Sequence, residues 1–479
     1  MLKVFSPCDG ALIASLNMDN GQTLAYKIAS AMAAQARFAL LPRVAREKLL
    51  ADYSDALKAN REKLIELVLY DAGKTGKEAA GEVDGAANII KQTITDATLP
   101  DFGGMKRVKE RPPVGVVGLI TSFNFPIAVA HWTLAPAILA GNAVIWKPSE
   151  KTPLVAIAAK EIFDEIAGEF ADLLQIIIGG RDIGQRLANH EQVDMISATG
   201  SVAMGQGIKE ILAQKSNNEI PPILELGGNN GVIISEKITP EHLEWSVGAI
   251  MWSFLATSGQ RCTNTRRLIV QRKIYDEVAL LFKQRIENFI ASGAIVNPLS
   301  GVSNDYGYAA LIDADAFRRF ESAKQQAQRE GGEIRFGARL LVHEAHNVFF
   351  VEPALALMPA QTEIMYTETF APLLYIAPYD DFAEAIDMLN APENAGLVGG
   401  IYTQNAQEAE IFARENLAGH SLINSPKGTG TPAFGMGFGG NKHSGEGEIL
   451  NTADPLAAFT RRDRFSRIAV NSSVILRDA

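Results

Sequence analysis

Cys262 is the residue of this sequence best suited to nucleophilic chemistry. It lies in Ser258-Gly259-Gln260-Arg261-Cys262-Thr263, directly after an apolar segment that should be helical. A thiol reacts as its thiolate, so a nucleophilic cysteine needs a nearby base or positive potential, and partial exposure. Arg261 and the glycine turn could meet these conditions. The alternative is that Cys262 is a small buried hydrophobic side chain. For Cys8 we expect either such a buried side chain or a position on the surface.

Glu225 is a candidate general base. It stands at the end of a short apolar run and is followed by Leu226-Gly227-Gly228-Asn229-Asn230. Burial in such a setting raises the pKa of a carboxyl group toward neutrality, which suits a base that activates water. The alternative is a solvated glutamate in front of an Asn/Gly turn.

Asn124 is a candidate donor to an oxyanion. It lies in Phe123-Asn124-Phe125-Pro126, a tight turn expected at the carboxyl end of a strand. Its side-chain amide could donate a hydrogen bond to a developing oxyanion together with a backbone N–H. Taken alone, Asn124 fits better as a turn residue that tolerates left-handed backbone.

Two further segments could bind a dinucleotide. Lys147-Pro148-Ser149-Glu150 ends an expected strand, where a lysine and a carboxylate can bind ribose hydroxyls and a glutamate repels a 2′-phosphate. Thr199-Gly200-Ser201 places small residues at an expected helix N-terminus, which favours a pyrophosphate. The first segment also fits a solvated charge run, and the second lacks the G-x-G-x-x-G fingerprint.

The elements that must position these residues alternate between strands and helices. Apolar strand runs at 114–120, 143–147, 175–178 and 195–198 are separated by helical segments. This predicts a parallel, doubly wound α/β sheet that binds its ligand beyond the carboxyl ends of the strands. The alternation resumes after Glu225 and indicates a second α/β domain. Before the first strand, residues 23–74 have a helical spacing that should stop at Gly73, and 82–95 predict another helix.

Composition limits the class of protein. The 479 residues predict two or three domains, and 47% hydrophobic with 21% charged residues is typical of a globular chain. The formal net charge of −10 argues against nucleic-acid or anionic-membrane partners. Two cysteines favour a reducing compartment, and no apolar run approaches the roughly 18 residues of a membrane span. We therefore expect a cytoplasmic protein.

Two other patterns do not support a site. His343-Glu344-Ala345-His346 lacks the spacing of the H-E-x-x-H zinc motif, so we expect no metal. Arg461, Arg462, Arg464 and Arg467 form a basic patch with few aromatic residues, which favours a solvated or subunit-facing strand over RNA binding.

Seven motifs in series resemble the aldehyde dehydrogenase superfamily over essentially the whole chain. Besides the segments around Asn124, Lys147, Gly200, Glu225 and Cys262, they include Glu368-Thr369-Phe370-Ala371-Pro372 and Gly439-Gly440-Asn441-Lys442-His443-Ser444-Gly445. The resemblance implies oxidation of an aldehyde through a thioester on Cys262, with Glu225 activating the deacylating water and Asn124 in the oxyanion hole.

The resemblance also implies the cofactor contacts and the domain organisation. Lys147, Ser149 and Glu150 would bind the adenosine ribose of NAD (NADP being possible), Gly200 and Ser201 the pyrophosphate, and Glu368 with Phe370 the nicotinamide end. The family fold implies a Rossmann-like cofactor domain at 1–92 and 113–227, an α/β catalytic domain at 228–456, and a small β oligomerisation segment at 93–112 and 457–479. A homodimer or homotetramer is expected.

Within the superfamily the sequence is most similar to the α-aminoadipic semialdehyde dehydrogenase branch. Arg261 would then pair with a substrate carboxylate, and Phe123 would also contact the substrate. The sequence departs from that branch near Asp84, where the branch has a substrate-reading acid and this sequence continues Gly85-Ala86-Ala87. It departs also at Lys427–Pro432, where the branch has a substrate-anchoring loop. It departs again at Ile449, where the branch has a glutamate proposed as a proton relay.

Two alternatives use the same fold. A CoA-acylating semialdehyde dehydrogenase would use the same cysteine with a thiol acceptor, and Glu225 argues against it. A non-catalytic binding protein would be expected to have lost Cys262, Glu225 or Asn124, and all three are present.

Overall fold

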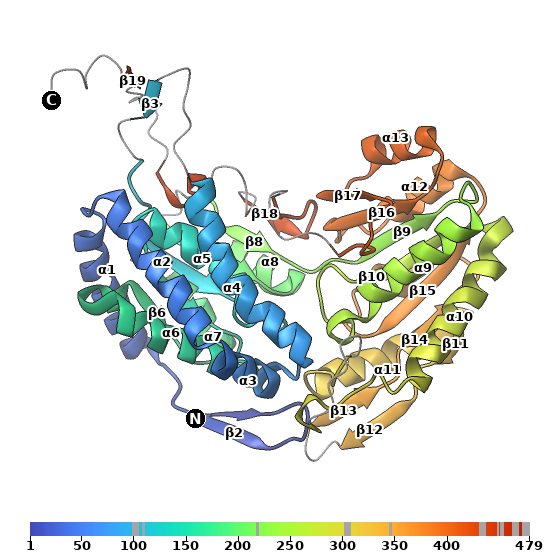
Figure 1. The fold of residues 1–479 in the computed structure, drawn as a ribbon, viewed down its shortest axis with the longest axis horizontal. Helices are drawn as coiled ribbons and strands as arrows, with labels where there is room; N and C mark the ends of the chain where they lie inside the picture. Colours follow the sequence, from blue (N-terminus) through green and yellow to red (C-terminus); the bar gives the residue numbers. More distant parts are fainter. Residues whose placement is uncertain are drawn as a thin grey trace.

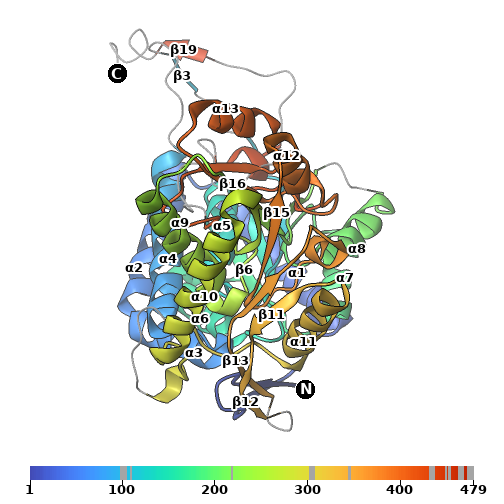
Figure 2. The same cartoon turned by 90° about the vertical axis from the view of Figure 1, so that its right-hand side faces the viewer.

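The computed structural model describes residues 1–97, 105–107, 111–216, 220–300, 308–343, 347–430, 437–447, 450, 455–461 and 469–471. These residues form two lobes, each built on a mainly parallel sheet covered by helices (Figure 1). A short two-stranded ribbon stands away from both lobes, and Figure 2 shows the same ribbon from the side.

The first lobe contains a sheet of six strands in the order β18-β8-β7-β4-β5-β6. β8 to β6 run parallel, and β18 is antiparallel to β8. Every residue of β4 and β5 is buried, which explains why they appear in the sequence as continuous apolar runs. The strands are β4 (Val116–Ile120), β5 (Ala143–Lys147), β6 (Leu174–Ile176), β7 (Met195–Thr199), β8 (Ile223–Glu225) and β18 (Gly445–Glu446).

Helices cover both faces of this sheet (Figure 1). The helical segment expected at 23–74 is divided into three helices, and the last of them ends at Gly73, whose φ of 63° gives the left-handed cap that glycine tolerates best. The helices are α1 (Gly21–Phe38), α2 (Arg43–Ala59), α3 (Arg61–Ala72), α4 (Gly76–Asp96), α5 (Ala128–Leu139), α6 (Leu154–Ala167), α7 (Arg181–Asn189) and α8 (Val202–Ala213).

The second lobe contains a sheet of seven strands in the order β11-β14-β15-β10-β9-β16-β17. Only β11 runs antiparallel to its neighbour. The strands are β9 (Asn230–Ile234), β10 (Thr265–Gln271), β11 (Glu333–Phe336), β14 (Ala354–Leu357), β15 (Leu373–Tyr379), β16 (Val398–Tyr402) and β17 (His420–Ile423). The helices are α9 (Pro240–Leu255), α10 (Tyr275–Ala291), α11 (Ala314–Arg329), α12 (Phe382–Asn390) and α13 (Ala406–Glu415).

Smaller elements complete the chain. β1 (Leu2–Phe5) and β2 (Leu12–Leu16) form a hairpin, β12 (Arg339–His343) pairs with β13 (Val348–Val351), and β3 (Met105–Arg107) pairs with β19 (Ala469–Asn471) in the outlying ribbon. Short 3-10 helices are η1 (Gly168–Leu173), η2 (Ala256–Gly259), η3 (Arg272–Ile274), η4 (Pro298–Ser300), η6 (Glu363–Tyr366) and η7 (Ala457–Phe459).

This arrangement is the expected α/β fold with two sheets. The proposed domain boundaries remain a prediction, and β18 shows that a late segment of the chain joins the sheet of the first lobe. In the described part of the chain, no helix has the length and apolar character needed to span a bilayer.

Candidate active site

A cavity of about 1440 Å³ contains most of the residues that the sequence singled out. Its walls come from α4, from the turns that follow β4, β5, β7 and β8, from α9, and from the loop before β10. The cavity therefore lies at the carboxyl ends of the parallel strands, where the sequence pattern predicted a ligand site. Every expected site residue lines it, namely Phe123, Asn124, Lys147, Ser149, Glu150, Gly200, Ser201, Glu225, Arg261, Cys262, Glu368 and Phe370.

The loop that carries Cys262 begins with an unusual turn after α9. Thr257 and Ser258 have φ values of 54° and 57°, and Gly259 follows at 71°. Left-handed backbone costs a non-glycine residue about 1–3 kcal/mol, so the surrounding structure must hold the turn. The turn also packs closely against the rest of the protein, because a Cβ atom at Gly259 would lie only 2.4 Å from the carbonyl group of Ala371.

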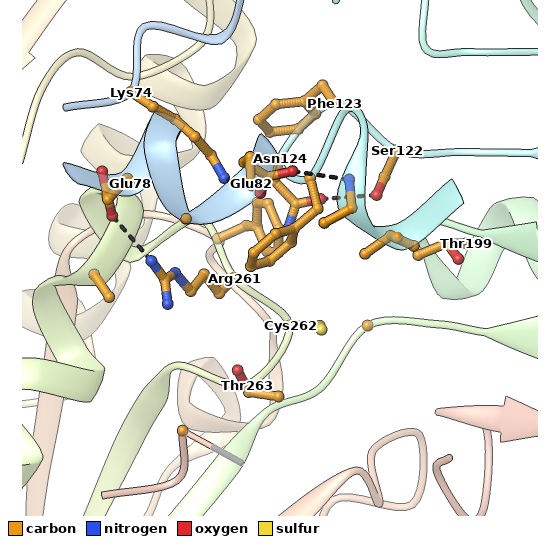
Figure 3. Close-up of a pocket in the computed structure, with 18 of the residues that line it drawn as sticks. Lys74, Glu78, Glu82, Ser122, Phe123, Asn124, Thr199, Arg261, Cys262 and Thr263 are labelled. Carbon is orange, nitrogen blue, oxygen red and sulfur yellow. Dashed lines mark hydrogen bonds and ion pairs between the residues drawn. The ribbon is translucent and has the colours of Figure 1, made fainter. Parts of the chain in front are cut away.

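The environment of the Cys262 thiol favours its neutral form. Loss of hydration in the cavity, together with the nearby carboxylates of Glu368 and Glu225, raises its pKa to about 12. The cation that opposes this shift is Arg266. Our expectation that Arg261 supplies the positive potential is not supported by this geometry, because its guanidinium points away from the thiol and pairs with Glu78 at 3.0 Å (Figure 3).

Asn124 is held at both ends of its amide. Its Nδ2 donates to the carbonyl oxygen of Gln260 at 2.9 Å. Its Oδ1 accepts from the hydroxyl of Ser122 at 2.7 Å (Figure 3). Asn124 is not among the residues with positive φ, so the alternative of a left-handed turn residue does not apply. Since Nδ2 carries two hydrogens, one remains for a group in the cavity.

Glu225 is the last residue of β8 and is buried. Its Oε2 is enclosed and has no hydrogen-bond partner among the residues that the structure describes. Burial raises the pKa of its carboxyl group well above the ordinary value. An unpartnered buried carboxyl oxygen is costly, so its presence beside a nucleophile indicates a group that acts on a ligand or on water. The apolar run before Glu225 had predicted such a raised pKa.

The last residue of β5 and the turn that follows it bring a cation and a carboxylate to the far end of the cavity. Lys147 ends β5, and its Nζ donates to Glu150 at 2.9 Å. Burial raises the pKa of Glu150, but Lys147 outweighs this effect and keeps the carboxyl group ionised. Ser149, between them in sequence, is buried and accepts a hydrogen bond from the backbone N–H of Lys151.

The N-terminus of α8 forms another wall of this end. Ser201 is its N-cap, and its Oγ accepts from Met204 N at 3.2 Å. A side chain at Gly200 would lie 2.6 Å from the end of the Met204 side chain, so the glycine keeps this approach open. Backbone N–H groups and the helix dipole make such a site favourable for a phosphate.

Glu368 lines the cavity and is held by groups from two other segments of the chain. Its Oε1 accepts from Gly228 N at 3.1 Å and from Arg266 Nη2 at 3.3 Å. Burial raises its pKa, which these donors oppose. Its neighbour Phe370 makes an edge contact with Phe123 at 5.9 Å between ring centroids. The cavity is lined by the carboxylates of Glu150 and Glu368, by a lysine and by a helix N-terminus. Carboxylates and a lysine can bind the ribose hydroxyls of a dinucleotide, and a helix N-terminus can bind its pyrophosphate.

The opposite end of the cavity has aromatic and cationic walls. The guanidinium of Arg261 lies 5.6 Å from the ring centroid of Trp252 and 5.5 Å from that of Phe125. Lys427 lies over the same Trp252 ring at 5.5 Å. An aldehyde that enters here would meet Cys262 beyond these rings.

Several positioning residues were not predicted from the sequence. Arg266, in β10, donates to the carbonyls of Gly228, Gly259 and Arg261 around the nucleophile. Asn230, which we interpreted as part of a turn, donates to the carbonyl of Cys262 at 2.7 Å. A buried ion pair joins Lys74 and Glu82 at 2.6 Å, with the Lys74 ammonium over Phe125. An arginine at the start of an apolar strand, as at 266, was the one available hint.

Other sequence predictions have different outcomes. Cys8 is buried, as one of its two alternatives expected. In the described residues no group of three His, Cys, Asp or Glu side chains could hold a metal ion. Glu344 to His346, Arg462, Arg464, Arg467, Thr431, Pro432 and Ile449 lie outside the described residues.

Comparisons with known proteins cover nearly the whole chain. The model of the aldehyde dehydrogenase family matches residues 1–463. A bovine (Bos taurus) protein, α-aminoadipic semialdehyde dehydrogenase, is 28% identical over 460 residues, which span 93% of this chain and 82% of that protein. These matches confirm the resemblance that the seven motifs indicated.

Solved structures agree with this family assignment. Lactaldehyde dehydrogenase from Escherichia coli has a TM-score of 0.86 at 27% identity and covers 98% of this chain and 95% of its own. An NADP-dependent glyceraldehyde-3-phosphate dehydrogenase from Bacillus halodurans, solved with NADP, has a TM-score of 0.84 at 27% identity and covers 96% of this chain and 94% of its own. The expected fold and enzyme class are thereby confirmed.

Proposed function

The chain belongs to the aldehyde dehydrogenase family, and on that premise we propose that it oxidises an aldehyde to a carboxylic acid through a thioester on Cys262. The observation that carries this mechanism is the meeting of Cys262, Glu225 and Asn124 in one cavity, from three separate segments of the chain. The cavity continues toward Lys147 and Glu150, so one space can hold both aldehyde and dinucleotide.

Cys262 forms the bond to the aldehyde carbon. As the sulfur attacks, the thiol proton passes to solvent water and the carbonyl oxygen becomes an alkoxide. The remaining hydrogen of Asn124 Nδ2 and the backbone N–H of Cys262 stabilise that charge. Because burial raises the pKa of the thiol, loss of its proton is part of the acylation step.

NAD is the cofactor that the far end of the cavity favours. When bound, its nicotinamide supplies the acceptor for the hydride that leaves the aldehyde carbon. We assign Lys147, Ser149 and Glu150 to the adenosine ribose, Gly200 and Ser201 to the pyrophosphate, and Glu368 with Phe370 to the nicotinamide end. The ionised carboxylate of Glu150 disfavours the 2′-phosphate of NADP.

Glu225 completes the cycle by activating water. Its raised pKa makes its carboxylate a stronger base than that of an exposed glutamate, and its Oε2 has no competing partner among the described residues. Water attacks the thioester carbon, the C–S bond breaks, and the acid leaves while Cys262 regains its proton. This role favours hydrolysis over transfer of the acyl group to CoA.

The substrate that fits best is an aldehyde with a carboxylate at its other end, such as a semialdehyde of the α-aminoadipic type. Arg261 and Lys427 both lie over Trp252 at the end of the cavity away from Glu150, so two cations face an entering anion. Because the guanidinium of Arg261 already forms an ion pair with Glu78, we propose that Lys427 also binds the substrate carboxylate. Phe123 is assigned to the substrate side as well.

The assembly and location of the protein are part of this proposal. The outlying ribbon of β3 and β19 forms a separate two-stranded sheet and is assigned to a homodimer or homotetramer interface (Figure 1). Two unpaired cysteines fit a cytoplasmic setting. Light scattering coupled to size exclusion tests the oligomer, and a monomer would contradict it.

The test of the function is the formation of reduced cofactor with a panel of aldehydes, using NAD and NADP separately. The panel includes α-aminoadipic, succinic and glutaric semialdehydes, aliphatic aldehydes and benzaldehyde, with Cys262→Ala as the inactive control. We expect activity with NAD and a preference for the carboxylated aldehydes. Equal activity on unsubstituted aldehydes would overturn the substrate class, and inactivity with both cofactors would overturn the dehydrogenase function.

A further inference from the structure

The carboxylate of Glu78 joins helix α4 to the turn that precedes the nucleophile. Its Oε1 accepts hydrogen bonds from Thr257 N at 2.7 Å, from Thr257 Oγ1 at 2.9 Å, and from Arg261 Nη2 at 3.0 Å. Its Oε2 accepts from Thr75 N and Thr75 Oγ1 at the start of α4. Figure 3 shows Glu78 and Arg261 facing each other on the α4 side of Cys262.

These bonds hold a backbone that the local sequence does not favour. Thr257 is β-branched, and its left-handed φ of 54° is a conformation that such residues rarely adopt. Ser258 continues the left-handed path, and its hydroxyl is tied to the carbonyl of Ala309 at 2.8 Å. Because Glu78 binds both the N–H and the hydroxyl of Thr257, it fixes the first residue of the turn.

The turn leads directly to the atoms that surround the reacting carbonyl. Gln260 N donates to the carbonyl of Thr257 at 2.9 Å, and the carbonyl of Gln260 accepts from Asn124 Nδ2. Cys262 follows two residues later. A shift at Thr257 would therefore move the nucleophile and the acceptor that orients Asn124 together.

We propose that Glu78 is a positioning residue for acylation, which fixes the left-handed turn at Thr257 and so aligns Cys262 with Asn124. The inference rests on the proposed function, because it assigns Glu78 to the thioester-forming step. Glu78 acts through the turn and through Arg261, and it does not contact the aldehyde carbon.

The hydrogen bonds that Glu78 already makes within the protein distinguish a positioning role from direct binding of substrate. Both oxygens already accept bonds from the protein, and its side chain is 14% exposed beside a 19% exposed Arg261. Arg261 also donates from Nε to Thr257 Oγ1 at 2.8 Å, so the three side chains form one closed set. A substrate amine or hydroxyl would have to displace a bond that the turn uses.

The first test compares Glu78→Ala and Glu78→Gln in the presteady-state burst of reduced cofactor. A misplaced nucleophile loop should slow the burst in Glu78→Ala by about 10- to 100-fold, with the KM for NAD changed less than about twofold. Glu78→Gln keeps one carbonyl oxygen for Thr257 and should stay within about fivefold of the wild type. A normal burst rate in Glu78→Ala would overturn the proposal.

The second test asks whether the backbone of Thr257 is what Glu78 controls. Glycine adopts positive φ without steric cost, so Thr257→Gly should make the turn less dependent on Glu78. The loss caused by Glu78→Ala should then fall to about threefold or less in the Thr257→Gly background, a strong departure from additivity. An undiminished loss in that background would refute the assignment.

A third measurement does not depend on aldehyde oxidation. Hydrogen exchange should be faster at the amides of Thr257 and Gln260 in Glu78→Ala than in the wild type, while exchange in β10 stays unchanged. Asp381→Ala, which removes the N-cap of the distant helix α12, serves as a control for stability loss alone. It should lower the melting temperature and leave the burst and the turn amides unaltered.

These results separate the two proposals. A wild-type enzyme that gives no burst with any aldehyde would contradict the proposed function, and the exchange data would still report on the turn. An active wild type with unchanged exchange in Glu78→Ala would contradict the role of Glu78 alone.

Discussion

Replacing Asn124 by alanine should slow thioester formation by about 100- to 1000-fold, the usual cost of removing one oxyanion donor. The structure explains why a single hydrogen carries this effect. One hydrogen of Nδ2 goes to the Gln260 carbonyl at 2.9 Å, and Ser122 fixes the amide oxygen at 2.7 Å. The second hydrogen is the side-chain donor left for the alkoxide.

The magnitude corresponds to about 2.7–4 kcal/mol of lost transition-state stabilisation. The alanine variant also leaves the buried Gln260 carbonyl without its donor, at a cost of about 1–3 kcal/mol to the folded state. Its melting temperature should therefore fall together with its rate. Asn124→Asp should be slower still, since its carboxylate would face both the Gln260 carbonyl and the alkoxide.

The assay is the rate of the burst of reduced cofactor after rapid mixing of enzyme, NAD and a saturating aldehyde. Ser122→Ala is the matched comparison, because it removes the bond that orients Asn124 and leaves the donor in place. Its burst should slow by less than about tenfold. The reasoning is wrong if Asn124→Ala retains a burst within about threefold of the wild-type rate.

Three further predictions concern other parts of the cavity. The steady-state rate should rise with pH, because the raised pKa of Glu225 leaves its carboxyl protonated at low pH and only the ionised form is a base; a flat pH profile would contradict this. Glu150→Gln should raise the ratio of kcat/KM for NADP to that for NAD by at least about tenfold, since the 2′-phosphate loses a repelling charge, and an unchanged ratio would argue against that contact. Gly227→Ala should weaken NAD binding in a calorimetric titration, because the added Cβ would lie 2.1 Å from Glu368 Oε2; wild-type affinity would show that Glu368 does not hold the cofactor.

The sheet and the polar residues at its edge could be predicted from the sequence because their signals are local. Parallel strands such as β4 and β5 are buried on both faces and therefore appear as unbroken apolar runs. The residues that follow them at the strand ends, such as Asn124 and Glu150, lie in the cavity for the same topological reason.

The start of α4 was harder to predict. The sequence pattern placed this helix at 82–95, whereas it begins at Gly76. Glycines at 76, 81 and 85 lower the helix propensity of this segment. The helix forms nonetheless, because Thr75 and Glu78 make a capping box and the apolar face of α4 packs on its neighbours.

The network around the nucleophile could not be predicted, because its partners are distant in the sequence. Glu78 and Arg261 are 183 positions apart, and no local pattern connects them. Sequence proximity suggested that Arg261 activates Cys262, but the turn directs Arg261 toward α4 and leaves Arg266 as the nearby cation. The left-handed backbone at Thr257 could not be predicted either, because threonine disfavours this conformation.

The most direct test of the central claim is the intact mass of Glu225→Gln after mixing with NAD and aldehyde. Without the base, acylation should proceed and hydrolysis should stall, so the protein should gain the mass of one acyl group on Cys262 with one equivalent of reduced cofactor. Turnover that continues at the wild-type rate would contradict the role of Glu225. One equivalent of reduced cofactor with stalled turnover and no added mass on Cys262 would contradict the thioester.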